Sequence, residues 1–215
     1  SRVGSDIARV VTNDLAGSGV FRPIDPAAFV EQSVPIDAVP KFGDWRSVNA
    51  QALVNGQAGQ MADGRLKVDF RLWDVFAGQQ LEGLGYQTQP SNWRRIAHII
   101  AAAIYKRITG EDGYFDSRIA YVAETGPQNQ RVKRLAIMDQ DGANQRYLTD
   151  GSTLVLTPRF SPSQQEITYI DYSSGVPRVY IRQIDSGRQE TVGDFPGMTF
   201  APRFSPDGQK VIMSM

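Results

Sequence analysis

Apolar residues in the first half of the chain recur at the three- and four-residue spacing of helices in two places. The first stripe consists of Ile7, Val10, Val11 and Leu15, and the second of Trp93, Ile96, Ile99, Ile100, Ala103, Ile104 and Ile108. The first stripe predicts a helix that begins near Ser5 and ends at Gly17. The second predicts a helix that begins after residues 90–92 (Pro-Ser-Asn) and ends at Gly110.

Between these two stripes the pattern changes to the two-residue alternation of strands. Leu66, Val68, Phe70 and Leu72 share one face of a predicted strand over 66–74. Further strands are expected over 21–24, 52–56 and 80–87, with helical turns over 26–30 and 45–48. Residues 1–112 are therefore predicted to form a small α/β domain with two main helices on a three- to four-stranded sheet. It ends at the polar, glycine-rich link 109–113.

The second half of the chain contains an internal repeat. Residues 157–162 (Thr-Pro-Arg-Phe-Ser-Pro) reappear 44 residues later as 201–206 (Ala-Pro-Arg-Phe-Ser-Pro). The same offset superimposes Leu135 on Val179, and the strand pattern of 167–170 on that of 211–214. Matching apolar character through a whole period indicates one structural unit used repeatedly.

Each period of this repeat contains four short β segments separated by polar turns, which is typical of a β-propeller blade. Residues 113–215 hold just over two such periods. Propellers need about four to eight blades, because each blade buries its faces only against its neighbours. We therefore expect an α+β two-domain chain whose second domain is an incomplete β-propeller, and we expect the sequence to be a fragment.

Composition narrows the classes of function. The 215 residues are 41% hydrophobic and 21% charged, as in soluble globular proteins. Lys and Arg total 23 and so do Asp and Glu, which argues against nucleic-acid binding, since such binding draws on an excess of basic residues. Cysteine is absent, so thiol catalysis and disulfides are excluded. The longest mostly apolar run, 96–104, is too short for the ~20 residues of a membrane span.

The sequence predicts no catalytic, metal or cofactor site. His98 is the only histidine, and its helical position predicts a solvent-exposed side chain near Tyr105. No Gly-x-Ser-x-Gly elbow supplies a nucleophile for it. Residues 139–142 (Asp-Gln-Asp-Gly) lack the other acidic ligands of a calcium loop and predict a hairpin turn. Arg159 and Arg203 recur at matching positions of the repeat, which indicates a structural role first.

The segments that enter the repeated Pro-Arg-Phe-Ser-Pro strand carry bulky apolar residues in both periods. These are Leu154 and Leu156 in the first copy, and Met198 and Phe200 in the second. In a propeller such loops surround the mouth of the central channel, where exposed apolar side chains would suit a protein-binding patch. Packing between blades is the alternative, and the pattern alone leaves both interpretations open.

The combination of features resembles the TolB family, the periplasmic component of the Tol–Pal system of Gram-negative bacteria. The resemblance rests on the α/β domain, on its junction at 115–122 (Phe-Asp-Ser-Arg-Ile-Ala-Tyr-Val) and on the intact blade motif at 202–208. It covers residues 6–215. Residues 161–165 depart from the motif, with Ser-Pro-Ser-Gln-Gln in place of Ser-Pro-Asp-Gly. The family's signal peptide, N-terminal segment, first α/β strand and about four of its six blades have no counterpart here.

The resemblance implies a non-enzymatic periplasmic adaptor that supports outer-membrane integrity and cell division. Its expected partner is Pal, the peptidoglycan-associated lipoprotein, bound across one face of the propeller, and some colicins would capture that face. The expected Pal-facing residues are Gly197, Met198, Thr199, Phe200, Ala201, Leu154, Val155, Leu156 and Thr157. The family's N-terminal segment, which binds TolA, is absent here. The alternative hypothesis is the regulatory propeller of a serine peptidase, whose hydrolase domain would follow residue 215.

Overall fold

The computed structural model describes residues 2–31, 34–193 and 195–215. The chain divides into two compact units, Ser1–Asp116 and Ser117–Met215. The first unit contains α-helices, 3-10 helices and strands, and the second contains strands throughout the part that is described. The predicted fold class, an α/β domain followed by part of a propeller, is confirmed.

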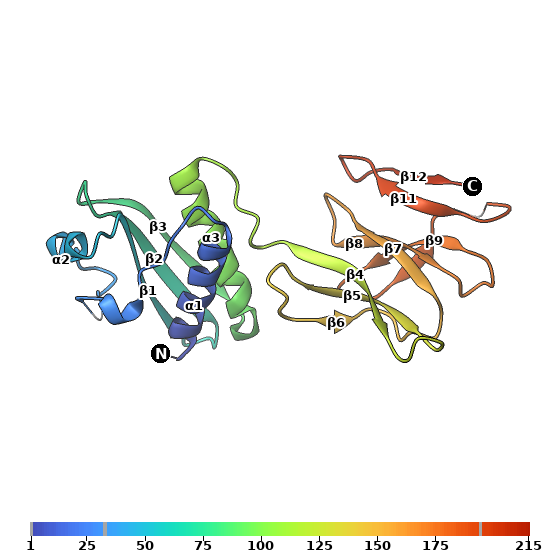
Figure 1. The fold of residues 1–215 in the computed structure, drawn as a ribbon, viewed down its shortest axis with the longest axis horizontal. Coiled ribbons are helices and arrows are strands. Elements are labelled where there is room, and N and C mark those ends of the chain that lie inside the picture. The colour runs from blue at the N-terminus through green and yellow to red at the C-terminus, as the bar shows by residue number, and fades with distance from the viewer. Residues whose placement is uncertain (1, 32–33, 194) are drawn as a thin grey trace. The chain divides into compact units, whose positions relative to one another are not determined.

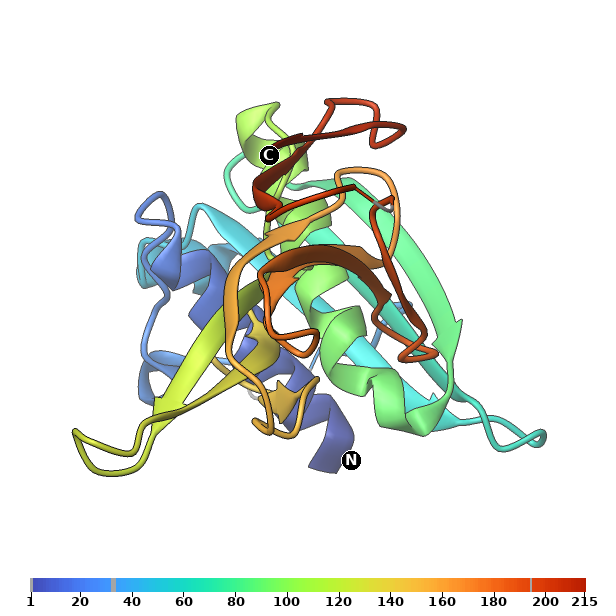
Figure 2. The same cartoon turned by 90° about the vertical axis from the view of Figure 1, so that its right-hand side faces the viewer.

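The first unit is an antiparallel sheet with its two long helices on one face (Figures 1 and 2). In chain order its elements are α1 (Arg2–Gly17), η1 (Pro26–Ala28), α2 (Phe42–Ser47), β1 (Ala52–Gln60), β2 (Leu66–Asp74), β3 (Gln79–Thr88), η2 (Pro90–Asn92) and α3 (Trp93–Thr109). The sheet order is β1-β2-β3. Gly110 ends α3 in the left-handed conformation, with φ of 82°. Within the described ranges, no helix combines the length and apolar character needed to cross a bilayer.

Residues 21–24 do not form the strand that the sequence predicted; they have no regular secondary structure and do not join the sheet. Phe21 instead packs against the helix core, with its ring 6.1 Å from that of Tyr105 in α3. Burial of this side chain holds the segment in place without a ladder of backbone hydrogen bonds. Among the described residues the sheet therefore has three strands, the lower of the two expected numbers.

The alternation along β2 positions the core of this unit. Phe70 and Leu72 are almost completely buried against α1 and α3, and burying a side chain of this size is worth about 1.5–3 kcal/mol. On the other face of β2, Trp73 belongs to a second cluster that includes Trp45 and Leu53. Asn55 completes this cluster: its Oδ1 accepts from Trp73 Nε1 at 2.8 Å, and its Nδ2 donates to the carbonyls of residues 34 and 35.

The second unit consists of three separate sheets. From first to last they are drawn in yellow, orange and red in Figure 2. Its strands are β4 (Arg118–Thr125), β5 (Val132–Asp139), β6 (Arg146–Tyr147), β7 (Val155–Phe160), β8 (Glu166–Asp171), β9 (Arg178–Gln183), β10 (Gln189–Thr191), β11 (Phe200–Phe204) and β12 (Val211–Ser214). The sheets have the orders β4-β5-β6, β10-β9-β8-β7 and β11-β12.

The repeat explains why these sheets differ in size. An offset of 44 residues places β4, β5 and β6 on β8, β9 and β10, and β7 and β8 on β11 and β12. The middle sheet therefore shows all four strands of one blade. The first sheet contains the second to fourth strands of this plan, and the last contains the first two. Backbone hydrogen bonds repeat as well: Leu148 N donates to Leu135 O at 2.7 Å, and Val192 N to Val179 O at 2.9 Å.

The first two sheets of this unit share an apolar core. Leu135, Ile137, Val155, Ile167 and Tyr169 are buried in it. The Tyr169 hydroxyl donates to Gln189 Oε1 at 2.8 Å, and its ring stacks on that of Tyr180. Burial, with a smaller contribution from the Asp171 carboxylate, raises the pKa of Tyr169 to about 12. This tyrosine therefore remains neutral over the whole physiological pH range.

Candidate partner-binding loops of the propeller unit

Two equivalent loops lead into the first strands of successive sheets, β7 and β11, which contact each other (Figure 1). Leu154 precedes β7 and Met198 precedes β11, at the same position of the repeat. The side chain of Leu154 is 40% exposed and that of Met198 is 53% exposed. Two residues further along each loop, Phe200 is exposed and Leu156 is half-buried. Both periods thus present a large apolar side chain to solvent at the same place.

Two of the predicted site residues are buried and have structural contacts. Val155 is fully buried in the core between the first two sheets. Thr199 is 2% exposed; its Oγ1 accepts from Val179 N at 2.9 Å, and its own N–H donates to Pro177 O at 3.0 Å. Gly197 has a φ of 87°, which glycine adopts without strain. These residues shape the loops, whereas Leu154, Met198 and Phe200 provide the exposed apolar surface.

The last residue of each predicted Pal-facing segment, 154–157 and 197–201, lies in a strained backbone conformation. Thr157 has a φ of 48° and Ala201 a φ of 55°, and each precedes a proline. The strand pairing shifts register at both places, between Leu156 and Arg159 in one sheet and between Phe200 and Arg203 in the next. A left-handed conformation costs a non-glycine residue roughly 1–2 kcal/mol. The repeated bulge therefore belongs to the blade plan, and it changes the direction of each strand directly after its exposed apolar residues.

Replacing Ala201 with glycine is expected to raise the free energy of unfolding, by up to about 1 kcal/mol, because relief of the left-handed strain exceeds the added chain entropy. The matched control is Ala123→Gly in β4, where glycine is expected to lower it by about 0.5–1 kcal/mol. Urea denaturation of both variants measures the difference. Equal losses in the two variants would show that position 201 carries no strain.

Among the described residues, the recurring arginines Arg159 and Arg203 each form a hydrogen bond to the carbonyl of the preceding proline. Their Nη1 atoms donate to the carbonyls of Pro158 at 2.9 Å and Pro202 at 2.8 Å, respectively.

The sequence did not single out Val176, which is also exposed, in the turn between β8 and β9. Pro177 beside it accepts the hydrogen bond from Thr199, so this turn lies next to the loop that carries Met198. A blade diagram drawn at the 44-residue period would have placed these loops at the same end of the strands.

The prediction that His98 is exposed to solvent is wrong. Its side chain is 3% exposed, and its Nδ1 lies 2.6 Å from Asp14 Oδ2, which is buried in α1. The helices α1 and α3 pack against each other and bring the two side chains together. The signal in the sequence was Asp14 itself, which falls within the apolar stripe of the first helix and therefore needs a buried partner.

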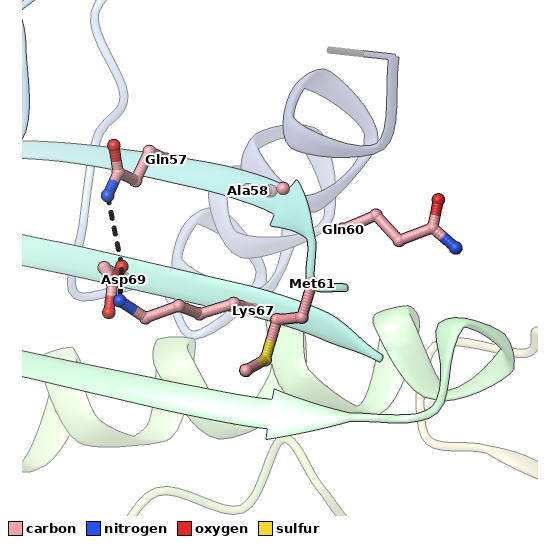
Figure 3. A pocket seen from close by; sticks show the side chains of 7 residues that line it. Gln57, Ala58, Gln60, Met61, Lys67 and Asp69 are labelled. Atoms are coloured by element: carbon pink, nitrogen blue, oxygen red, sulfur yellow. Dashed lines mark hydrogen bonds and ion pairs between the residues drawn. The ribbon is translucent and has the colours of Figure 1, made fainter. Parts of the chain in front are cut away.

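A shallow pocket of about 260 Å³ lies on the sheet of the first unit. In it, Gln57 of β1 and Lys67 of β2 converge on Asp69 (Figure 3). Partial burial raises the pKa of Asp69, but hydrogen bonds from Gln57 and Lys67 lower it more, so it lies below its ordinary value. A Cβ at Gly85 would lie only 2.5 Å from Asp69 Oδ1, so the glycine leaves room for this carboxylate. An ionised carboxylate that accepts hydrogen bonds from two side chains stabilises this face of the sheet and is a poor proton acceptor.

A small α/β unit followed by sheets that repeat at a 44-residue period defines a two-domain protein whose second domain is part of a β-propeller. Family comparisons agree with this class. The TolB amino-terminal domain matches residues 1–81, and the TolB beta propeller domain matches residues 105–215. The chain belongs to the TolB family, and the resemblance inferred from the sequence is confirmed.

Two relatives illustrate this membership. The chain is 61% identical over 181 residues to the Tol-Pal system protein TolB of Paramagnetospirillum magneticum, covering 84% of this chain and 40% of that protein. The crystal structure of TolB from Acinetobacter baumannii superimposes with a TM-score of 0.78 at 30% identity, over 95% of this chain and 50% of that one. The chain therefore spans half or less of the length of these relatives.

Proposed function

We propose that this protein is a non-enzymatic adaptor of the Tol–Pal system in the periplasm. It binds the lipoprotein Pal through the loop face of its propeller unit, and so supports outer-membrane integrity and cell division. Family membership and the 61% identity to a Tol-Pal system protein support this role. They favour it over the alternative of a regulatory propeller that serves a serine peptidase.

The observation that carries the proposal is the pair of exposed apolar side chains at one position of the repeat, Leu154 and Met198. Large apolar groups on ordered loops lose little entropy on binding and act as anchors at protein interfaces. Neighbouring Val176 and Phe200 extend the apolar surface in the same unit. A partner with a complementary apolar patch and a polar rim fits this surface.

Further parts of the proposal concern segments and partners outside this chain. TolA is expected to bind a segment that precedes α1 in the family, and colicins are expected to compete with Pal for the loop face. Within this chain, the single histidine, His98, is buried against Asp14 in the helix layer. A general base needs access to a substrate, and burial of this side chain denies it that access.

Calorimetric titration of the full-length protein with the soluble domain of Pal tests the proposal. We expect saturable binding with one-to-one stoichiometry. Absence of binding by a folded, complete propeller would overturn the Pal assignment. Labelling with a fluorophosphonate probe separates the alternative, since a serine peptidase would be labelled stoichiometrically and an adaptor would not.

A further inference from the structure

Two arginines at the same position of the repeat hold the loops that lead into β7 and β11. Arg134 in β5 donates from Nε to Asp150 O at 2.9 Å, and Arg178 in β9 donates from Nη1 to Phe195 O. We propose that Arg134 and Arg178 are positioning residues of the partner-binding face, which fix the loops that present Leu154 and Met198. This inference rests on the proposed function and adds residues that do not themselves belong to the apolar patch.

The contacts of Arg134 go well beyond one hydrogen bond. Its Nη1 donates to Thr125 Oγ1 at 3.1 Å, and its guanidinium lies over the ring of Tyr147, 5.1 Å from the centroid. A Cβ on Gly151 would lie 3.0 Å from Arg134 Cγ, so the loop crosses directly over the arginine stem. Hydrogen bonds in two directions and close packing restrict this side chain to one position.

The residue after each arginine provides a second attachment through its backbone. Leu135 N donates to Thr149 Oγ1 at 2.9 Å, and Val179 N donates to Thr199 Oγ1 at 2.9 Å. The threonines come from different positions of the period, yet they satisfy equivalent N–H groups. Each loop is therefore attached to the neighbouring strand at two points, one through an arginine side chain and one through a backbone amide.

The exposed apolar residues lie between attached positions. Met198 is bracketed by Phe195, which accepts from Arg178, and by Thr199. Leu154 follows Asp150, which accepts from Arg134, and its own carbonyl accepts from Tyr172 N at 3.1 Å. A loop fixed on both sides of its anchor residue loses little freedom when a partner binds, so its attachments contribute to affinity without contacting the partner.

A double-mutant cycle with the soluble domain of Pal tests this inference. We expect Arg178→Gln to weaken binding about 5- to 30-fold, as an ordering cost of this kind predicts. In a Met198→Ala background its effect should fall below about 2-fold. Arg134→Gln should couple to Leu154→Ala in the same way, whereas the crossed pair, Arg178→Gln with Leu154→Ala, should be additive. Equal effects of Arg178→Gln in both backgrounds would overturn the inference.

Arg159→Gln is the matched control. It removes the same charge, but the hydrogen bond that the structure describes for Arg159 goes to the carbonyl of its neighbour Pro158 and not to a loop, so this variant should bind Pal within about 2-fold of the unmodified protein. If Arg178→Gln fails to fold, Arg178→Lys, which retains a donor toward Phe195, should restore the fold and binding. Amide hydrogen exchange of residues 195–199 in the free protein should accelerate in Arg178→Gln, and unchanged exchange would overturn the anchoring role. Lack of binding by the unmodified protein overturns the proposed function alone.

Discussion

Replacing Asp14 with alanine is expected to lower the free energy of unfolding by about 1–3 kcal/mol, the usual cost of leaving a buried polar group without its hydrogen-bond partner. The carboxylate and the imidazole of His98 are both at least 97% buried and lie 2.6 Å apart between α1 and α3. Without the carboxylate, the ring nitrogen loses a strong hydrogen bond in a place where water cannot replace it. Urea denaturation followed by circular dichroism measures this loss.

An exposed pair on the same helix provides the control. Arg9 and Asp6 are 2.7 Å apart, but the arginine side chain is 68% exposed, so Asp6→Ala should cost less than about 1 kcal/mol. Asp14→Asn, which preserves shape and an acceptor oxygen, should lose less than Asp14→Ala. If Asp14→Ala costs no more than Asp6→Ala, the buried pair contributes no more to stability than a surface ion pair.

Replacing Met198 with arginine is expected to weaken Pal binding by about 30-fold or more, which corresponds to roughly 2 kcal/mol or above for a central interface residue. The guanidinium would be desolvated against the partner without a counter-charge, and that cost is large. Because Met198 is 53% exposed in the free protein, the thermal midpoint should remain unchanged. Calorimetric titration and a melting curve together measure both expectations.

Gln164→Arg is the control for this substitution. Gln164 is exposed in the turn after β7, at the opposite end of that strand from Leu154, and it receives the same added charge. Its binding to Pal should be unchanged, and Met198→Leu should also retain most of the affinity. Unchanged affinity in a folded Met198→Arg variant would move the binding site away from this loop.

The sequence alone was sufficient for the helices and the sheet of the first unit and for the blade plan of the second. Periodicity reports which face of a local element is apolar. β2 buries the face that its spacing predicts, from Leu66 to Leu72, and α3 buries Ile96, Ile100 and Ile104 of its predicted stripe but leaves Ile108 exposed. The 44-residue repeat was equally informative, because equivalent sequences adopt equivalent strands and hydrogen bonds. The family resemblance followed from the same local motifs.

Features that depend on distant parts of the chain appeared only in the tertiary structure. The sequence could not pair His98 with Asp14, 84 residues away, or place Phe21 in the helix core instead of a strand. Nor could it separate buried Thr199 from exposed Met198, since both lie in one apolar stretch. These outcomes depend on which element packs against a residue, and the spacing of neighbouring side chains does not contain that information.

The bulges and the loop attachments show where the two sources of information meet. The sequence determined that Thr157 and Ala201 are equivalent, and likewise Arg134 and Arg178, because both pairs share the 44-residue offset. Only the structure showed that the first pair has positive φ and that the second pair holds the loop of the following strand. Equivalence is a property of the repeated sequence, whereas backbone strain and side-chain hydrogen bonds arise only when the strands pair and the loops pack in the folded chain.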